Sequence, residues 1–293
     1  MCASVAQEQI ERKVLDEGLA QRLAWVPGDA GGRLQLPAPS PGGETALIGR
    51  IGDGDPLIGA EEAVARQDPA ALLRGLGALA LLARSRRVVL TIRDDLTRLL
   101  ATLRRLAEGT VVRVVAVPAV YPQDDASLRC DVAQILDRRP AAFADALVVS
   151  SVVLGDVAMA LDGEAIGCRW VSVSGAVRRP TTRLFPLGCR VDDAVAAAGG
   201  ATENVWVAYE NGLVSGRRVD ADDVIDLATR ALVVLPPEHP RVQDAAVPLA
   251  DRVRQAASTC VQCRLCTEGC PVWLTGGHLE PHLVMRHLLR SFG

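Results

Sequence analysis

The chain has 293 residues, of which 49% are hydrophobic, and a formal net charge of −3. This length suits two domains and a small appendage, and the composition excludes global disorder. The small negative charge gives no electrostatic basis for binding nucleic acid or an anionic membrane surface. The sequence lacks a run of the roughly 18 apolar residues that a transmembrane helix needs. The acidic N-terminus also lacks the basic-then-apolar order of a signal peptide, so we expect a cytoplasmic protein with reduced thiols.

The first half of the chain predicts an α/β domain behind a short N-terminal segment. Residues 1–24 are predicted to form a polar helix, and residues 27–43 are rich in Pro and Gly, which is typical of a linker. From residue 45 onward strands and helices are predicted to alternate, at 45–51, 61–84, 88–92, 94–108, 111–117, 125–138 and 146–149. This alternation predicts a three-layer domain with a parallel sheet.

The pattern changes near residue 165, where the predicted elements become shorter and strands dominate. The expected elements are strands at 170–175, 184–188, 205–209 and 231–235 and a helix at 191–198. They predict a small α+β unit, which the prolines at 236, 237 and 240 bring to an end. A helix over 241–257 is predicted to lead from this unit into the C-terminal segment.

Four cysteines near the C-terminus follow the spacing of a bacterial ferredoxin. They are Cys260, Cys263, Cys266 and Cys270, and Pro271 follows the last of them. The short gaps bring thiolates around the corners of one cubane, and thiolate is the soft ligand that iron–sulfur clusters use. The spacing therefore predicts a [4Fe–4S] cluster. The alternatives are a structural zinc site, which usually pairs two distant CxxC motifs, and chance.

The fourth ligand of this cluster depends on what else the sequence contains. In proteins with two clusters, the last cysteine of such a run binds the other cluster. A second run is absent here, so Cys270 is the expected fourth ligand if the chain is complete. In a fragment, Cys270 would lack its intended cluster and the first cubane its intended fourth cysteine. The remaining cysteines lack ligand spacing and are interpreted as ordinary thiols: Cys2, Cys130, Cys168 and Cys189.

Other side chains beside the run are weaker candidates. Gln262 and Arg264 lie inside it, where hydrogen bonds to sulfur influence the reduction potential; the alternative is that both are solvated loop side chains. His278 and His282 are four residues apart, as in some metal sites. Pro281 between them favours a helix start instead.

Sequence motifs along the chain resemble those of one protein family. The cysteine motif at 260–271 is followed by Gly277-His-Leu-Glu-Pro-His282. The upstream motifs are Val117-Pro-Ala-Val-Tyr-Pro-Gln123, Trp170-Val-Ser-Val-Ser-Gly-Ala-Val177, Phe185-Pro-Leu-Gly188 and Ala198-Gly-Gly200. From about residue 45 to the end, the chain resembles PduS-type cobalamin reductases. These proteins are related to the C subunit of the Rnf complex and to the flavin-bearing subunit of respiratory complex I.

The resemblance implies a division of the chain into four parts. After an N-terminal helix and linker at 1–44, it implies an α/β domain at 45–163 that resembles the flavin-binding domain of the complex I flavin subunit. It further implies a β-grasp (SLBB) domain at 164–238 and a helical iron–sulfur segment at 239–293. The sequence lacks the family's second cysteine run and C-terminal extension. The resemblance therefore predicts that the chain is a truncated relative of the family.

The flavin site implied by the resemblance is degenerate. Asp53 and Asp55 lie where the family has an acidic Glu-x-Glu-Pro turn near its flavin, although such turns are commonly only solvated. The family's glycine-rich flavin loop corresponds to residues 18–27, where bulky Leu23 and Trp25 replace glycines whose N–H groups approach a phosphate. We therefore expect FMN to bind weakly or not at all.

Two functional hypotheses follow from these features. The leading one is an electron-transfer protein of the cobalamin-reductase type, which passes electrons through its cluster to a flavoprotein, a ferredoxin or a corrinoid enzyme. NADH-dependent oxidoreductase activity would follow only if flavin binding is retained. The alternative is a flavin-less scaffold or assembly subunit, or the product of a decayed gene. The resemblance also implies association with a microcompartment or a membrane complex.

Overall fold

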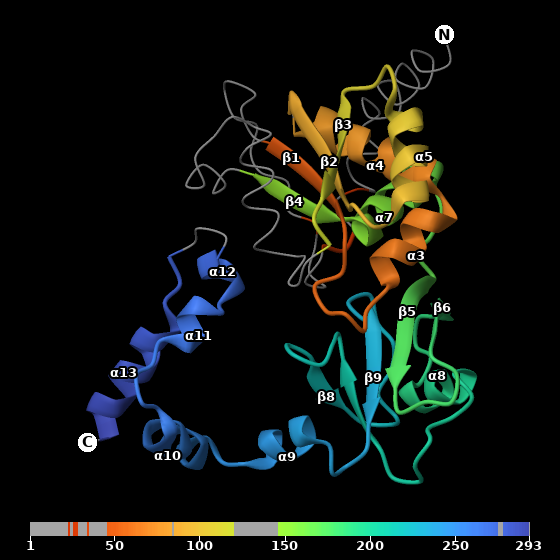
Figure 1. Cartoon of the computed structure of the whole chain (residues 1–293). Coiled ribbons are helices and arrows are strands. Elements are labelled where there is room, and N and C mark those ends of the chain that lie inside the picture. The colour runs from red at the N-terminus through yellow and green to blue at the C-terminus, as the bar shows by residue number, and fades with distance from the viewer. Residues whose placement is uncertain are drawn as a thin grey trace.

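The computed structural model describes residues 23, 26–28, 34, 46–83, 85–119, 146–274 and 278–292. It contains two sheets, one above the other in Figure 1, and a string of short helices that ends at the C-terminus. The predicted N-terminal helix and most of the linker lie outside the described residues, as do the predicted helix at 125–138 and the Tyr-Pro motif at 121–122.

The first sheet is parallel, as the sequence predicts. Its strands are β1 (Ala46–Ile51), β2 (Arg87–Arg93), β3 (Val112–Val117) and β4 (Leu147–Ser150), in the order β3-β2-β1-β4. The central strand β1 is buried along its whole length, which explains why its sequence is apolar apart from Arg50.

Helices α3 (Ala60–Gln67), α4 (Pro69–Leu82), α5 (Thr97–Ala107) and α7 (Ser151–Asp162) accompany this sheet. The sequence predicted one helix over 61–84, but the chain breaks at Asp68. This residue is extended before Pro69, and its side chain accepts a hydrogen bond from the backbone N–H of Ala71, which caps α4. Helix α4 packs so closely on α7 that a Cβ on Gly75 would lie 2.3 Å from the carbonyl oxygen of Leu154.

The second sheet is mixed and has five strands. They are β5 (Cys168–Gly175), β6 (Thr181–Pro186), β7 (Val207–Glu210), β8 (Arg217–Val219) and β9 (Ala231–Leu235), in the order β6-β5-β9-β7-β8. Strands β5 and β9 are parallel, whereas the other pairs are antiparallel. Helix α8 (Val191–Ala197) packs on this sheet over a second apolar core. The fold class predicted from the sequence is confirmed.

Five helices follow the second sheet: α9 (Pro240–Ala246), α10 (Leu249–Thr259), α11 (Leu265–Glu268), α12 (Pro271–Leu274) and α13 (Pro281–Phe292). The predicted helix at 241–257 is split by Pro248 into α9 and α10. Helix α9 remains attached to the second sheet through Val242, whereas α10–α13 contact chiefly one another. Among the described residues, none of the helices combines the length and apolar character needed to cross a membrane.

Candidate functional site

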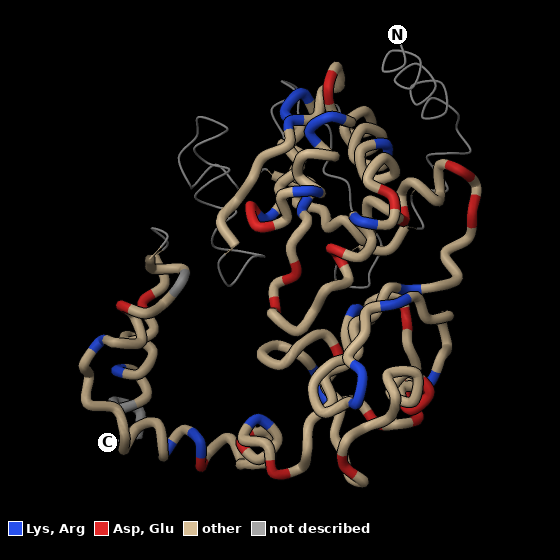
Figure 2. Tube along the Cα trace, turned by 45° about the vertical axis from the view of Figure 1, so that its right-hand side comes forward, with Lys and Arg blue, Asp and Glu red and all other residues tan. Residues whose placement is uncertain are grey.

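Two regions contain the residues singled out in the sequence. One is the seam between the two sheets, formed by the 52–59 loop, the start of α3, and the loops of the second sheet that face them. The other is the cluster segment, which we define as α10–α13 and the cysteine-bearing loop within it. Figure 2 shows acidic and basic residues interspersed along the trace.

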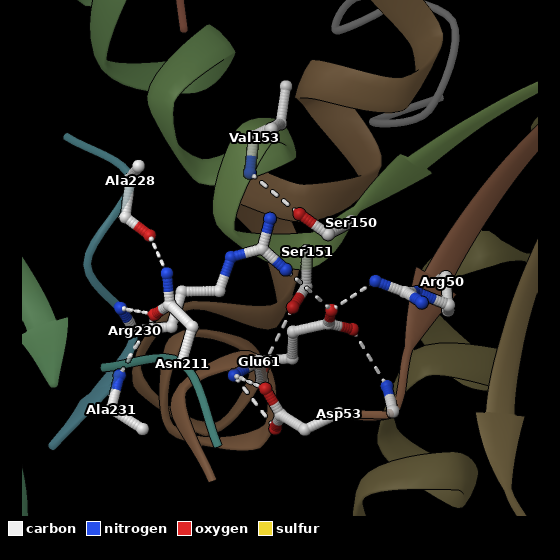
Figure 3. Close-up of polar contacts among 11 residues, drawn as sticks. Arg50, Asp53, Glu61, Ser150, Ser151, Val153, Asn211, Ala228, Arg230 and Ala231 are labelled. Carbon is white, nitrogen blue, oxygen red and sulfur yellow. Dashed lines mark hydrogen bonds and ion pairs between the residues drawn. The ribbon is translucent and has the colours of Figure 1, made fainter. Parts of the chain in front are cut away.

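The seam is centred on Glu61, whose side chain is fully buried. Its carboxylate accepts hydrogen bonds from Arg50 Nη2 at 2.6 Å and from the backbone N–H of Gly52 at 2.9 Å. Arg230, which precedes β9 in the second sheet, lies 3.6 Å away on the other side (Figure 3). Glu61 thus connects a strand of the first sheet to the start of a strand of the second.

Asp53 lies beside this carboxylate and accepts hydrogen bonds from the backbone N–H of Glu61 at 3.2 and 3.3 Å. Burial raises the pKa of Asp53 to about 6. Burial likewise raises the pKa of Glu61 to about 8, with the Arg50 charge opposing the rise and Asp53 adding to it. The two carboxyl groups therefore hold protons at higher pH than ordinary acids.

Asp55, the second acidic residue of the turn, is neither solvated nor directed at open space. It is 6% exposed, and Oδ1 accepts the backbone N–H of Leu57 at 3.0 Å. Its Oδ2 accepts the backbone N–H groups of Leu213 and Val214 in the β7–β8 turn, at 2.9 and 3.3 Å. Gly212 in that turn has φ +112°, and a Cβ there would lie 2.7 Å from Asp55. Asp55 therefore joins the two sheets.

Further buried or half-buried contacts extend the seam. Arg169 on β5 donates to Asp156 on α7 at 2.6 Å, and the two side chains are only 4% and 5% exposed. Arg169 Nε also donates to the carbonyl of Leu227 at 3.0 Å. The backbone N–H of Gly59 donates to Ser172 Oγ at 2.9 Å. The sequence alone singled out none of these side chains, because partners so far apart in sequence leave no local pattern.

Part of the segment that corresponds to the family's flavin loop contributes to the core. Leu23 and Val26 are buried in the apolar cluster of the first sheet. The backbone N–H of Leu34 donates to the carbonyl of Val26 at 2.8 Å. Gly18 and Trp25 of this loop lie outside the described residues.

The four cysteines of the cluster segment differ in exposure. Cys263 and Cys266 are exposed, Cys260 is half-buried and Cys270 is buried. Gln262 and Arg264 between them have positive φ, +57° and +68°, so the loop turns sharply twice within the run. Among the described residues, no group of three or more His, Cys, Asp or Glu side chains is gathered closely enough to hold a metal ion. Cluster ligation by these four cysteines therefore stays a prediction.

Two side-chain contacts organise this loop. Gln262 Nε2 lies 3.1 Å from Cys260 Sγ. Thr267 on α11 is fully buried, and its Oγ1 accepts the backbone N–H of His282 at 3.1 Å and lies 2.8 Å from the ring Nδ1. Pro281 begins α13, as predicted, and His282 is used in this contact, whereas His278 is exposed. The pair links the helix that carries Cys266 to α13.

The donor chemistry of the loop suits an iron–sulfur cluster. Four thiols lie within eleven residues, and an amide N–H already points at one of the sulfurs. The other described cysteines are the free thiols Cys168 and Cys189, as interpreted from the sequence, and burial raises the pKa of Cys189. Cys2 and Cys130 lie outside the described residues.

Comparison with known proteins identifies relatives of the chain. Residues 170–217 match the model of the SLBB domain. The chain is 30% identical over 237 residues to "Cobalamin reductase PduS" of Salmonella typhimurium, in a match that covers 79% of this chain and 52% of that protein. The PduS protein of Citrobacter freundii is 28% identical over the same length. The C subunit of the ion-translocating oxidoreductase complex of Salmonella choleraesuis is 24% identical over 83% of this chain and 35% of that protein.

A solved structure supports the fold. An NAD⁺-reducing [NiFe]-hydrogenase in its H₂-reduced state superposes with a TM-score of 0.66 at 16% identity, over 98% of this chain and 56% of the hydrogenase chain. At this identity the likeness concerns the fold alone. The chain spans about half the length of the PduS proteins that it matches. The sequence identities and the matched domain model show that the chain is a homologue of the PduS cobalamin reductases and of the C subunits of ion-translocating oxidoreductases, and that it contains an SLBB domain.

Proposed function

We propose that the protein is an electron-transfer protein that relays electrons through one [4Fe–4S] cluster bound by Cys260, Cys263, Cys266 and Cys270. The observation that carries this proposal is the ferredoxin-type spacing of these cysteines, in a chain 30% identical to a cobalamin reductase. When bound, the cluster would supply one-electron chemistry. The chain's own contribution would be four thiolates, a loop with two sharp turns, and hydrogen bonds to sulfur.

The redox partner belongs to this proposal as well. The relatives are named as a cobalamin reductase and as a subunit of an ion-translocating oxidoreductase complex. By analogy we propose a corrinoid enzyme, a flavoprotein or a ferredoxin as partner, in the cytoplasm at a microcompartment or a membrane complex. The scaffold alternative gains no support from these names, since both describe redox proteins.

We propose further that FMN binds weakly, so that NADH oxidation is not this chain's own activity. Leu23 and Val26 fill the apolar core in the segment where the family has its glycine-rich flavin loop. Asp55 uses its carboxylate oxygens on backbone N–H groups of the 52–59 loop and of the β7–β8 turn. These observations leave the electron-relay role as the one the described residues favour.

Anaerobic reconstitution tests the proposal. We expect about four irons and four sulfides per chain, with the broad brown absorption of an iron–sulfur protein. Chemical reduction should give an EPR signal of a reduced cluster. The cluster should reoxidise when a cobalamin or a flavoprotein is added as acceptor. One zinc per chain with no iron under these conditions would overturn the proposal.

A further inference from the structure

The side chain of Gln262 is oriented in a way that the loop alone does not require. Its Nε2 lies 3.1 Å from Cys260 Sγ, while its Oε1 is buried and has no hydrogen-bond partner in the described part of the chain. A buried amide oxygen without a partner is unfavourable. In this orientation the side-chain amide contacts the sulfur of Cys260, and this contact explains the orientation.

The backbone of Gln262 points to the same conclusion. Its φ of +57° is in the left-handed region, which costs free energy for a residue other than Gly, Asn or Asp. Such a conformation at a site of expected chemistry is a reason to ask what the side chain does. Arg264 has the same kind of backbone, with φ +68°, yet its side chain is exposed. The turn itself therefore does not bring a side chain onto a ligand sulfur.

We propose that Gln262 donates an N–H···S hydrogen bond to the Cys260 thiolate in the cluster-bound protein and raises the reduction potential of the cluster. This inference rests on the proposed function. Reduction adds an electron that is shared with the cluster and its thiolates, so a donor to Cys260 Sγ stabilises the reduced state more than the oxidised state. Gln262 is thus a tuning residue of the cluster and not one of its ligands.

The experiment compares four full-length proteins reconstituted anaerobically: the wild type, Gln262→Met, Gln262→Gly and the charge-conserving Arg264→Lys. Methionine has a similar length but no donor, and glycine removes the side chain while it adopts the left-handed backbone freely. The midpoint potential is measured by redox titration followed by EPR. We expect both Gln262 variants to have a more negative potential than the wild type, and Arg264→Lys, which keeps the charge, to match the wild type.

A spectroscopic readout separates hydrogen bonding from a general change of the loop. In ²H₂O, the reduced wild-type cluster should show an exchangeable deuteron coupling assigned to the amide, and both Gln262 variants should lack it. If Gln262→Met loses its iron, the glycine variant decides. Unchanged potential and coupling in a variant that retains its cluster would overturn the inference alone. Failure of the wild type to assemble any cluster would overturn the proposed function and, with it, this inference.

Discussion

The seam and the cluster segment differ in which side chains they bury and which they expose. The seam is closed by buried ionisable groups, among them Glu61 between two arginines and the Arg169–Asp156 pair. The cluster segment exposes large apolar side chains instead: Leu249, Val261, Leu265 and Leu274 are 69%, 81%, 68% and 69% exposed. Its one buried polar contact in the described part of the chain is the pair formed by Thr267 and His282.

This difference indicates which interactions stabilise each region. Breaking a buried ion pair is costly, because the remaining charge has left water without compensation. The two sheets are therefore fixed to one another by groups that the polypeptide itself provides. The cluster segment has short helices that contact chiefly one another, so we expect bound metal to contribute much of its folding free energy. The two regions should consequently respond to different perturbations.

The largest expected effect is the loss of the cluster in Cys263→Ser. A serine oxygen is a poorer ligand for iron than a thiolate, so most of the iron and the brown colour should disappear. Because Cys263 lies far along the chain from the seam, the unfolding transition of the two sheets should stay within the error of the wild type. Cys168→Ala and Cys189→Ala serve as controls and should retain full iron content. Loss of iron in either control would mean that the assigned fourth ligand is wrong.

The second prediction concerns the seam. Asp156→Ala should destabilise the protein by about 3–5 kcal/mol, since Arg169 would be left buried without its carboxylate partner. Asp162 on the same helix pairs with Arg74 at 2.9 Å, with both side chains more than 40% exposed. Asp162→Ala should therefore cost no more than about 1 kcal/mol. Urea unfolding followed by circular dichroism measures both, and equal losses would contradict a seam held by buried charge.

Much of the fold and part of the site could be predicted from the sequence. Most strands of the two sheets have clear apolar runs, and the cysteine spacing is a local pattern. Strand β8 was not predicted, because Arg217–Val219 contains a single apolar residue. Helix α7 was missed because its Val- and Ala-rich sequence is apolar on all sides, which gives no helical periodicity. Its start and end are marked by Ser150, which caps it, and by the left-handed Gly163. The role of Asp55 was out of reach, because its partners Leu213 and Val214 are 158 and 159 residues away in sequence.

The third prediction tests the polar contact inside the cluster segment. Thr267→Val keeps the volume of the side chain but leaves the backbone N–H of His282 without an acceptor, at a cost of about 1–3 kcal/mol. We expect the cluster of this variant to be lost faster in air or in chelator than that of the wild type. Thr267→Ser retains the hydroxyl and should restore most of the lifetime. If serine and valine behave alike, the hydroxyl does not hold α11 on α13.

The fourth prediction is the pH dependence of the seam. Burial raises the pKa of Glu61 to about 8 and that of Asp53 to about 6, so the folded state binds more protons than the unfolded state between about pH 4 and pH 8. Stability from these groups is therefore present at the acidic end and lost as the pH rises, by at most ~1.4 kcal/mol per pH unit for each proton. Glu61→Gln should flatten the fall in unfolding free energy from pH 5 to pH 8. Glu62→Gln, which removes a neighbouring carboxylate paired with Arg66, should leave the slope unchanged.

The smallest expected effect is the binding of FMN to the isolated protein. Its affinity tests whether the domain of the first sheet binds a redox cofactor of its own. A phosphate needs several convergent N–H donors, and each donor missing at a charged group costs about 1.5–3 kcal/mol. Losing two would weaken binding by roughly two to four decades, at ~1.4 kcal/mol per decade. With Leu23 and Val26 buried in the core, we expect the isolated protein to bind FMN more weakly than micromolar. Riboflavin, which lacks the phosphate, should bind equally weakly, because nothing in the described part of the segment would recognise the phosphate. Sub-micromolar FMN affinity with a large preference over riboflavin would show that a phosphate cradle exists, and the seam would then border a flavin site as well as join two sheets.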